Sequence, residues 1–192
     1  MSRDPAAEMG GVNLYNMVRN RLTDQIDPLG LRPLMDVEAA FLEYFFGRTL
    51  DTSTIDVDTD FATRVNGRAW SPYGGNIRLP KDYFTAGDPC KVVRLEHVRI
   101  ASVFAHEATH VWQRQHYGSP TLQGIYLQPL NSLGIINAYT SPATNEPAEK
   151  FRQFARGNSE QQGQIVQDMV FAELSGLDTA PFALIRQLLD PM

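Results

Sequence analysis

The strongest constraint on this chain is a long helix-forming run that carries two histidines four positions apart. Residues 92–116 have apolar side chains at helical spacing, and Gly118 and Pro120 end the run. Within it, His106 and His110 stand at positions i and i+4, so both imidazoles project from the same side of a helix. Two imidazoles placed in this way can reach one ion. The sequence therefore predicts a long helix that forms part of a metal site.

Glu107 adds a carboxylate next to the first of these histidines. From there it can face a water molecule on the ion without being a ligand, which is the His-Glu-x-x-His arrangement of zinc peptidases. Zinc makes its bound water acidic near neutral pH, and a neighbouring carboxylate can accept the proton. We therefore expect Zn²⁺ as cofactor, with Glu107 as the catalytic base. The alternative is that both motif histidines are simply hydrogen-bonded at a helix surface, as we expect of His97 and His116.

A catalytic zinc site needs a third protein ligand and an open fourth position. Glu160 is the preferred ligand, because it begins a predicted helix over 159–174 that could pack beside the first. Ser159 is the expected N-cap of that helix, with Gln162 completing a capping box. The alternative interpretation of Glu160 is an ordinary acidic residue that the helix dipole favours. The remaining downstream carboxylates, of which the first is the reserve ligand, are Glu149, Glu146, Asp168 and Glu173.

Two further roles at the site have candidates. Gln164 or Asp168, one and two turns after Glu160, could orient a metal-binding histidine. In the loop-rich stretch over 119–147, Tyr126 and Tyr139 could donate a hydrogen bond to a developing oxyanion. Tyr139 is preferred as a catalytic residue, and the alternative is a role in packing or loop structure.

The remaining pattern predicts an α+β fold of the zincin-like type. Helices are expected over 35–46 and 181–189, in addition to the two already described. Short strands are expected over 54–58, 67–71 and 77–79, the last two flanking a turn at 72–76. We expect a small antiparallel sheet beside the metal helix. Residues 76–80 are the expected sheet edge on which an extended substrate would pair.

Composition excludes several classes of function. Hydrophobic residues make up 43% of the chain, enough for a real core, and the net charge of −5 without any Lys/Arg run argues against a nucleic-acid partner. Cys90 is the sole cysteine, so the chain has no intrachain disulfide and its metal ligands must be histidines and carboxylates. No apolar run is long enough to span a bilayer, and no signal peptide is expected at the start.

The first thirty residues resemble the end of the core repeat region of Rhs proteins. The resemblance rests on residues 11–20, GVNLYNMVRN, and on the Asp-Pro-x-Gly-Leu motif at 27–31, DPLGL. In that family the core forms a β-shell around a variable C-terminal toxin. The resemblance implies a remnant of the core over residues 1–31, self-cleavage after Leu31, and a toxin domain over residues 32–192.

The remainder of the chain resembles the metallopeptidase domains at the C-termini of Rhs and VgrG effectors. The matching stretches are 104–115, FAHEATHVWQRQ, and 158–168, NSEQQGQIVQD, and Met169 stands where many relatives have a bulky aromatic residue. The resemblance implies zinc binding by His106, His110 and Glu160. It also implies an antibacterial effector secreted through the type VI apparatus into a competing cell. Its partners would be a peptide or protein substrate, an immunity protein and the Rhs or VgrG delivery apparatus.

Two other functions remain open at this point. A peptidoglycan endopeptidase would use the same zinc site on a different substrate. A non-catalytic delivery or adaptor domain would carry a degenerate site, although the intact His106, Glu107 and His110 speak against it.

Overall fold

The computed structural model describes residues 32–59, 63, 67–72, 74–118 and 143–191. They belong to the second of two units into which the chain divides, Leu31–Met192. The first unit, Met1–Gly30, lies outside the described residues, as does the motif at 27–31. The expected core remnant and its cleavage junction therefore stay predictions.

Helix α3 (Val98–Tyr117) is the expected metal helix, and every residue from Phe104 to Gln113 on it is buried. Its end at Gly118, where φ is 77°, is confirmed. Its start is six residues later than the predicted Val92 (98 − 92). The reason is tertiary: Val93 forms an antiparallel bridge with Phe84, and its N–H donates to the buried Glu38 carboxylate at 2.7 Å.

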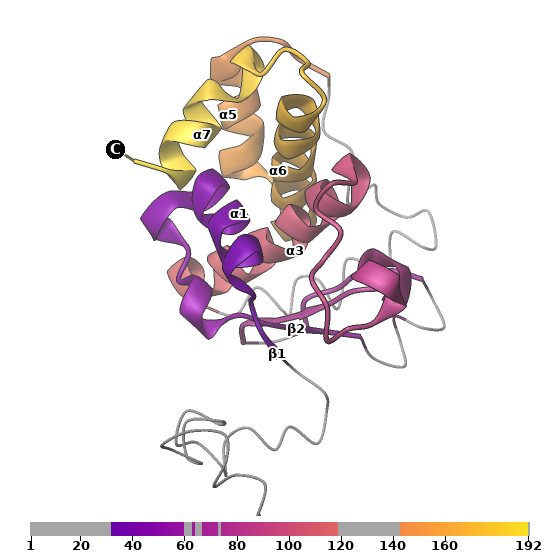
Figure 1. The fold of residues 1–192 in the computed structure, drawn as a ribbon. Helices are drawn as coiled ribbons and strands as arrows, with labels where there is room; N and C mark the ends of the chain where they lie inside the picture. Colours follow the sequence, from indigo (N-terminus) through magenta and orange to yellow (C-terminus); the bar gives the residue numbers. More distant parts are fainter. Residues whose placement is uncertain (1–31, 60–62, 64–66, 73, 119–142, 192) are drawn as a thin grey trace, which may run out of the picture. The chain divides into compact units, whose positions relative to one another are not determined.

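The other helices pack around α3. Helices α1 (Asp36–Phe46) and α6 (Ser159–Leu174) confirm the predicted segments, and α7 (Ala183–Leu189) follows a 3₁₀ turn, η6 (Ala180–Phe182). Helix α5 (Pro147–Arg156) was not predicted. Helix α6 packs along α3, while α5 packs against both α6 and α7 (Figure 1). The remaining 3₁₀ turns are η2 (Gly47–Thr49), η3 (Thr52–Thr54), η4 (Lys81–Tyr83) and η5 (Thr85–Gly87).

The sheet is mixed, so the prediction of an antiparallel sheet is wrong in part. Its strands are β1 (Arg32–Pro33), β2 (Asp56–Asp58) and β3 (Asn76–Arg78), in that order. Strand β1 is antiparallel to β2, but β2 and β3 are parallel. The expected strand over 67–71 is present only as a bridge between Trp70 and Arg78. The domain is therefore α+β with a small three-stranded sheet, and β3 contacts α3.

The outer edge of β3 is already occupied, which contradicts the predicted substrate edge at 76–80. The N–H of Arg78 donates to the Trp70 carbonyl at 2.8 Å, and the Arg78 carbonyl accepts from Trp70 at 2.9 Å. The carbonyl of Asn76 accepts from the Ser71 hydroxyl at 2.7 Å. Because these groups point away from β2, an extended peptide could pair here only by displacing residues 70–71.

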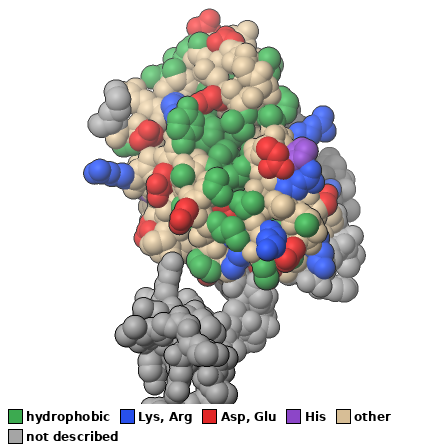
Figure 2. All heavy atoms as spheres, in the orientation of Figure 1, with side chains coloured by type: hydrophobic (Ala, Val, Ile, Leu, Met, Phe, Trp, Pro, Cys, Tyr) green, Lys and Arg blue, Asp and Glu red, His purple; other side chains and the backbone are tan. Residues whose placement is uncertain are grey.

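The core lies where α1, α3, α6 and the sheet meet. Met169, which stands where many relatives have an aromatic residue, is one of its buried residues. Figure 2 shows further apolar side chains in a band down the middle of one face, with Lys, Arg, Asp and Glu interspersed around it. The described part of that face therefore offers no continuous basic strip for phosphates. Among the described residues, no helix combines the length and apolar character needed to cross a membrane.

Arg32 joins the start of the described domain to its interior. Its two terminal nitrogens donate to both carboxylate oxygens of Glu38, each at 2.7 Å, and Glu38 is fully buried. Glu38 also accepts from the backbone N–H groups of Met35, at the N-cap of α1, and of Val93. The guanidinium donates as well to the carbonyls of Pro89 and Lys91. One ion pair thus ties β1, α1 and the segment before α3 together.

Replacing Arg32 by alanine is expected to lower the free energy of unfolding by about 3–5 kcal/mol, because the Glu38 carboxylate would stay buried without its cation. Urea denaturation followed by circular dichroism measures the change. The matched control is Arg152→Ala, which removes an exposed ion pair with Glu149 and should change stability by about 1 kcal/mol or less. Equal effects of the two substitutions would contradict the anchoring role of Arg32.

Candidate metal centre

The two motif histidines lie side by side on the buried face of α3, as their spacing predicts. His106 and His110 are 6% and 8% exposed, and their ring centroids are 5.0 Å apart. Burying two imidazoles is unfavourable unless they find polar partners or a metal ion. The alternative interpretation is therefore wrong in placing both histidines at a helix surface, and their role as metal ligands stays a prediction.

Helix α6 delivers Glu160 to this pair. Its N-cap is Asn158 rather than the predicted Ser159, and the capping box is completed by Gln161 rather than Gln162. The Asn158 side chain accepts from the Gln161 N–H at 2.9 Å, and the Gln161 side chain accepts from the Asn158 N–H at 3.1 Å. This cap fixes the first turn of α6 with Glu160 pointing at α3.

His106, His110 and Glu160 form a set that could hold a metal ion, as predicted. One carboxylate oxygen of Glu160, Oε2, lies 3.5 Å from Nε2 of His106 and 3.7 Å from Nε2 of His110. All candidate ligand atoms lie within 4.8 Å of one another. Tetrahedral zinc with bonds of about 2.0–2.1 Å holds its ligand atoms ~3.3 Å apart. The donor set is therefore of the kind that binds zinc, and its atoms would have to draw together to reach this spacing.

The charges in this set are strongly coupled. Burial alone would raise the pKa of Glu160, but hydrogen bonds from His106 and His110 and their charges hold it well below its usual range. Burial would lower the pKa of His110, but the hydrogen bond to Glu160 and the charges of Glu107 and Glu160 raise it. A metal ion bound at Nε2 of His110 would therefore compete with a proton at the same atom.

Gln113 orients His110, a role that sequence analysis did not assign. Its side-chain oxygen lies 3.0 Å from Nδ1 of His110, so that nitrogen carries a proton and Nε2 is the atom that faces Glu160. The Gln113 amide is itself fixed, because its nitrogen donates to the Ser159 carbonyl at 3.1 Å and to the Gln162 side chain at 2.8 Å. Its position three residues after His110 was the available signal.

The two predicted partners of a histidine, Gln164 and Asp168, bond each other instead, although burial raises the pKa of Asp168 and the charge of His106 opposes this rise. Gln164 donates to Asp168 at 2.8 Å, and neither hydrogen-bonds to His106. Among the described residues, Nδ1 of His106 is buried without a hydrogen-bond partner. The two histidines therefore differ in how firmly hydrogen bonds hold them.

Glu107 lies in the same buried region but outside the set of three candidate ligands. Its Oε2 atom is buried without a hydrogen-bond partner among the described residues. Burial raises the pKa of this carboxyl, opposed by His106 and His110 and reinforced by Glu160. An unpaired, buried carboxylate beside a metal-binding set can take and return a proton, which is the role the motif predicts.

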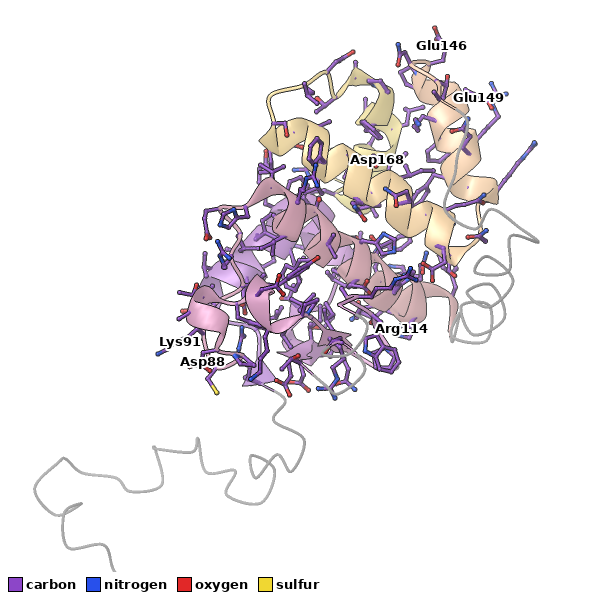
Figure 3. All side chains as sticks on the ribbon, turned by 90° about the vertical axis from the view of Figure 1, so that its right-hand side faces the viewer. Asp88, Lys91, Arg114, Glu146, Glu149 and Asp168 are labelled. Carbon is purple, nitrogen blue, oxygen red and sulfur yellow. The ribbon has the colours of Figure 1, made fainter. Side chains whose placement is uncertain are left out.

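Arg114 lies one turn beyond His110 on α3 and fixes the loop before β3 (Figure 3). Its guanidinium donates to the carbonyl of Gly74 at 2.7 Å, to the carbonyl of Ser71 at 3.1 Å and to the Ser71 hydroxyl. Burial lowers the pKa of Arg114, and the charge of Glu107 opposes this change. The loop is thus held on the side of α3 where Glu107 lies.

The remaining candidates lie elsewhere. Glu146 is the exposed N-cap of α5, and the half-buried Glu149 in its first turn pairs with Arg152 at 2.7 Å (Figure 3). Glu173 accepts from Tyr44 and lies near Arg186. His97 is the exposed N-cap of α3, and His116 bonds the Trp112 carbonyl at 2.9 Å, so both have the expected capping or surface roles. Tyr126 and Tyr139 lie outside the described residues, and their predicted roles stay untested.

Replacing Glu160 by alanine is expected to abolish stoichiometric metal binding, because only two of the three candidate ligands, both imidazoles, would remain. Glu149→Ala, in the first turn of α5, is the matched control and should bind metal like the wild type. Zinc per protein chain is measured after dialysis. Full zinc content in Glu160→Ala, or loss in Glu149→Ala, would contradict the assignment.

Replacing Gln113 by alanine is expected to weaken zinc binding by about 10–100-fold, because His110 would lose the acceptor that fixes its ring. Gln115 is the matched control on the same helix: it bonds Asp51 and Thr54 instead of a histidine. Competition with a chromogenic chelator gives both affinities. An equal change in Gln113→Ala and Gln115→Ala would show that Gln113 does not act through His110.

Comparison with known proteins identifies relatives of this domain. No family model matches the chain. Over 71% of its length the chain is 31% identical to the type VI secretion system spike protein VgrG2b of Pseudomonas aeruginosa, of which it spans 13%. The solved effector domain of VgrG2b matches with a TM-score of 0.62 and 25% identity, over 86% of this chain and 88% of that one. The chain is therefore homologous to the effector domain of VgrG2b.

Proposed function

We propose that this domain is a zinc-dependent peptidase that acts as an antibacterial effector of the type VI secretion system. The observation that carries the proposal is the convergence of His106, His110 and Glu160 from two helices. Glu107 lies beside them with a buried, unpaired oxygen. Homology to the VgrG2b effector domain supports the delivery part of the proposal, and the donor set supports the metallopeptidase part.

In the proposed reaction, the chain supplies the ligands and the proton transfer. His106 and His110 would bind zinc through Nε2, and Glu160 through a carboxylate oxygen. When bound, zinc supplies a Lewis acid that polarises a peptide carbonyl and lets water attack near neutral pH. Glu107 accepts a proton from the attacking water on its carboxylate and then donates it to the nitrogen of the leaving amine. Its raised pKa makes Glu107 a stronger base and so favours the first of these two steps.

The buried surroundings assist this chemistry. All four groups are at most 8% exposed, so charges act on one another through a medium of low polarity. Gln113 keeps His110 in the tautomer that leaves Nε2 free, and the Asn158 cap holds the first turn of α6 in place. The substrate would be a peptide or protein, and we expect an immunity protein in the producing cell. A degenerate adaptor domain is disfavoured because every group of the motif is in position.

Glu107→Gln is the sharpest test, because it removes the proton acceptor and keeps the shape of the side chain. Zinc content should stay at the wild-type level, while peptide cleavage should fall by about 100-fold or more. The full chain is expressed in bacteria with and without an added periplasmic signal, and growth is compared with that of Glu107→Gln and of the control Glu149→Gln. Killing in one compartment by the wild type and the control, but not by Glu107→Gln, is the expected result.

Two results would contradict the proposal. Equal killing by wild type and Glu107→Gln would exclude catalysis by this site as the cause of toxicity. Cleavage of purified peptidoglycan but not of protein substrates would replace the proposed substrate by cell-wall cross-links. Zinc content, measured on the same preparations, separates a failure of metal binding from a failure of catalysis.

A further inference from the structure

Helix α6 makes an unusually close contact with His106 at Gly163. A Cβ atom built on Gly163 would lie 2.8 Å from Nε2 of His106 and 3.0 Å from both Cδ2 and Cε1. Gly163 is buried, and it lies three residues after Glu160, on the same side of α6. The backbone of α6 thus rests against the imidazole that carries a candidate ligand atom.

A side chain at position 163 could be accommodated in only two ways. Ordinary contact begins near 3.4 Å, so the ring and the helix would have to separate by about 0.6 Å (3.4 − 2.8). Rotation of the ring would move Nε2 of His106 away from Glu160, which now lies 3.5 Å from it. A retreat of α6 would carry Glu160 away from both histidines.

No hydrogen bond on the Nδ1 side of the ring opposes its rotation. Among the described residues, Nδ1 of His106 has no hydrogen-bond partner, whereas Nδ1 of His110 lies 3.0 Å from the Gln113 oxygen. Apart from the contact of its Nε2 with Glu160, His106 is therefore positioned by packing, and it packs against the bare backbone at Gly163. A change at this position should act on His106 more than on His110.

We propose that Gly163 is a positioning residue of the metal centre: its missing side chain sets the separation between α6 and His106, and so brings Glu160 within ligand distance. This inference rests on the metal centre of the proposed function. Helix propensity does not explain a glycine at position 163, because glycine is a poor helix former and alanine or valine would favour the helix more. Its presence in a buried helical turn is explained by the imidazole that it faces.

The test compares Gly163→Ala and Gly163→Val with the wild type and with Gln167→Val, which places the same branched side chain one turn further along α6. Zn²⁺ affinity is measured by chelator competition, and the visible absorption of the Co²⁺-loaded protein reports the ligand geometry. Urea unfolding in the presence of a chelator gives the stability without metal. We expect Zn²⁺ affinity to fall by about 10-fold in Gly163→Ala and 100-fold or more in Gly163→Val.

The expected signature is loss of metal affinity, with an altered Co²⁺ spectrum, in a protein whose metal-free stability is unchanged or higher. Unchanged affinity in both Gly163 variants, with a wild type that binds zinc, would overturn this inference and leave the proposed function standing. A parallel loss of metal-free stability would also overturn it, because Gly163 would then serve packing alone. Absence of zinc binding by the wild type would overturn the proposed function and this inference together.

Discussion

Two imidazoles and two carboxylates share one buried region between α3 and α6, and several other contacts of the domain serve to hold these four groups in place. Removing such groups from water is unfavourable by several kcal/mol each unless they are paired. Glu160 with His106 and His110 provides that pairing, and a metal ion bound by the same three side chains would take its place. The capping box of α6 fixes the position of Glu160, and the amide of Gln113 fixes the ring of His110. A small shift of α3 or α6 would separate these groups and leave a charge buried without a partner.

Helix α3 and the candidate ligands were predictable because their signal is local. Spacing within α3 gives His106, Glu107 and His110, and Glu160 was found because α6 had a recognisable start, although the cap itself is one residue earlier than expected. The sheet was not predictable to the same degree. Strand β3 is three residues long, and its parallel pairing with β2 depends on a connection that no short pattern encodes. The predicted start of α3 at Val92 was wrong because Val93 pairs with Phe84 and hydrogen-bonds Glu38 instead of joining the helix.

Two residues of the site could not be assigned from their type alone. Gln113 is one of several glutamines near the motif, and only the position of the Ser159 and Gln162 partners shows that its oxygen faces His110. Gly163 appears in the sequence as a helix-weakening residue, and its role depends on which ring of another helix lies opposite it. The roles of Gln113 and Gly163 both depend on how closely α3 and α6 approach each other, and this distance is set only when the whole domain is packed.

The contact between Arg32 and Glu38 has a mechanical consequence. Arg32 belongs to a strand of only two residues, yet its guanidinium holds the first turn of α1 and the segment that leads into α3. Tension on the chain ahead of this residue would therefore be borne first by one buried ion pair. Once that pair separates, the same force would pull on α1 and on the approach to α3, so the domain would open from the side of its metal helix.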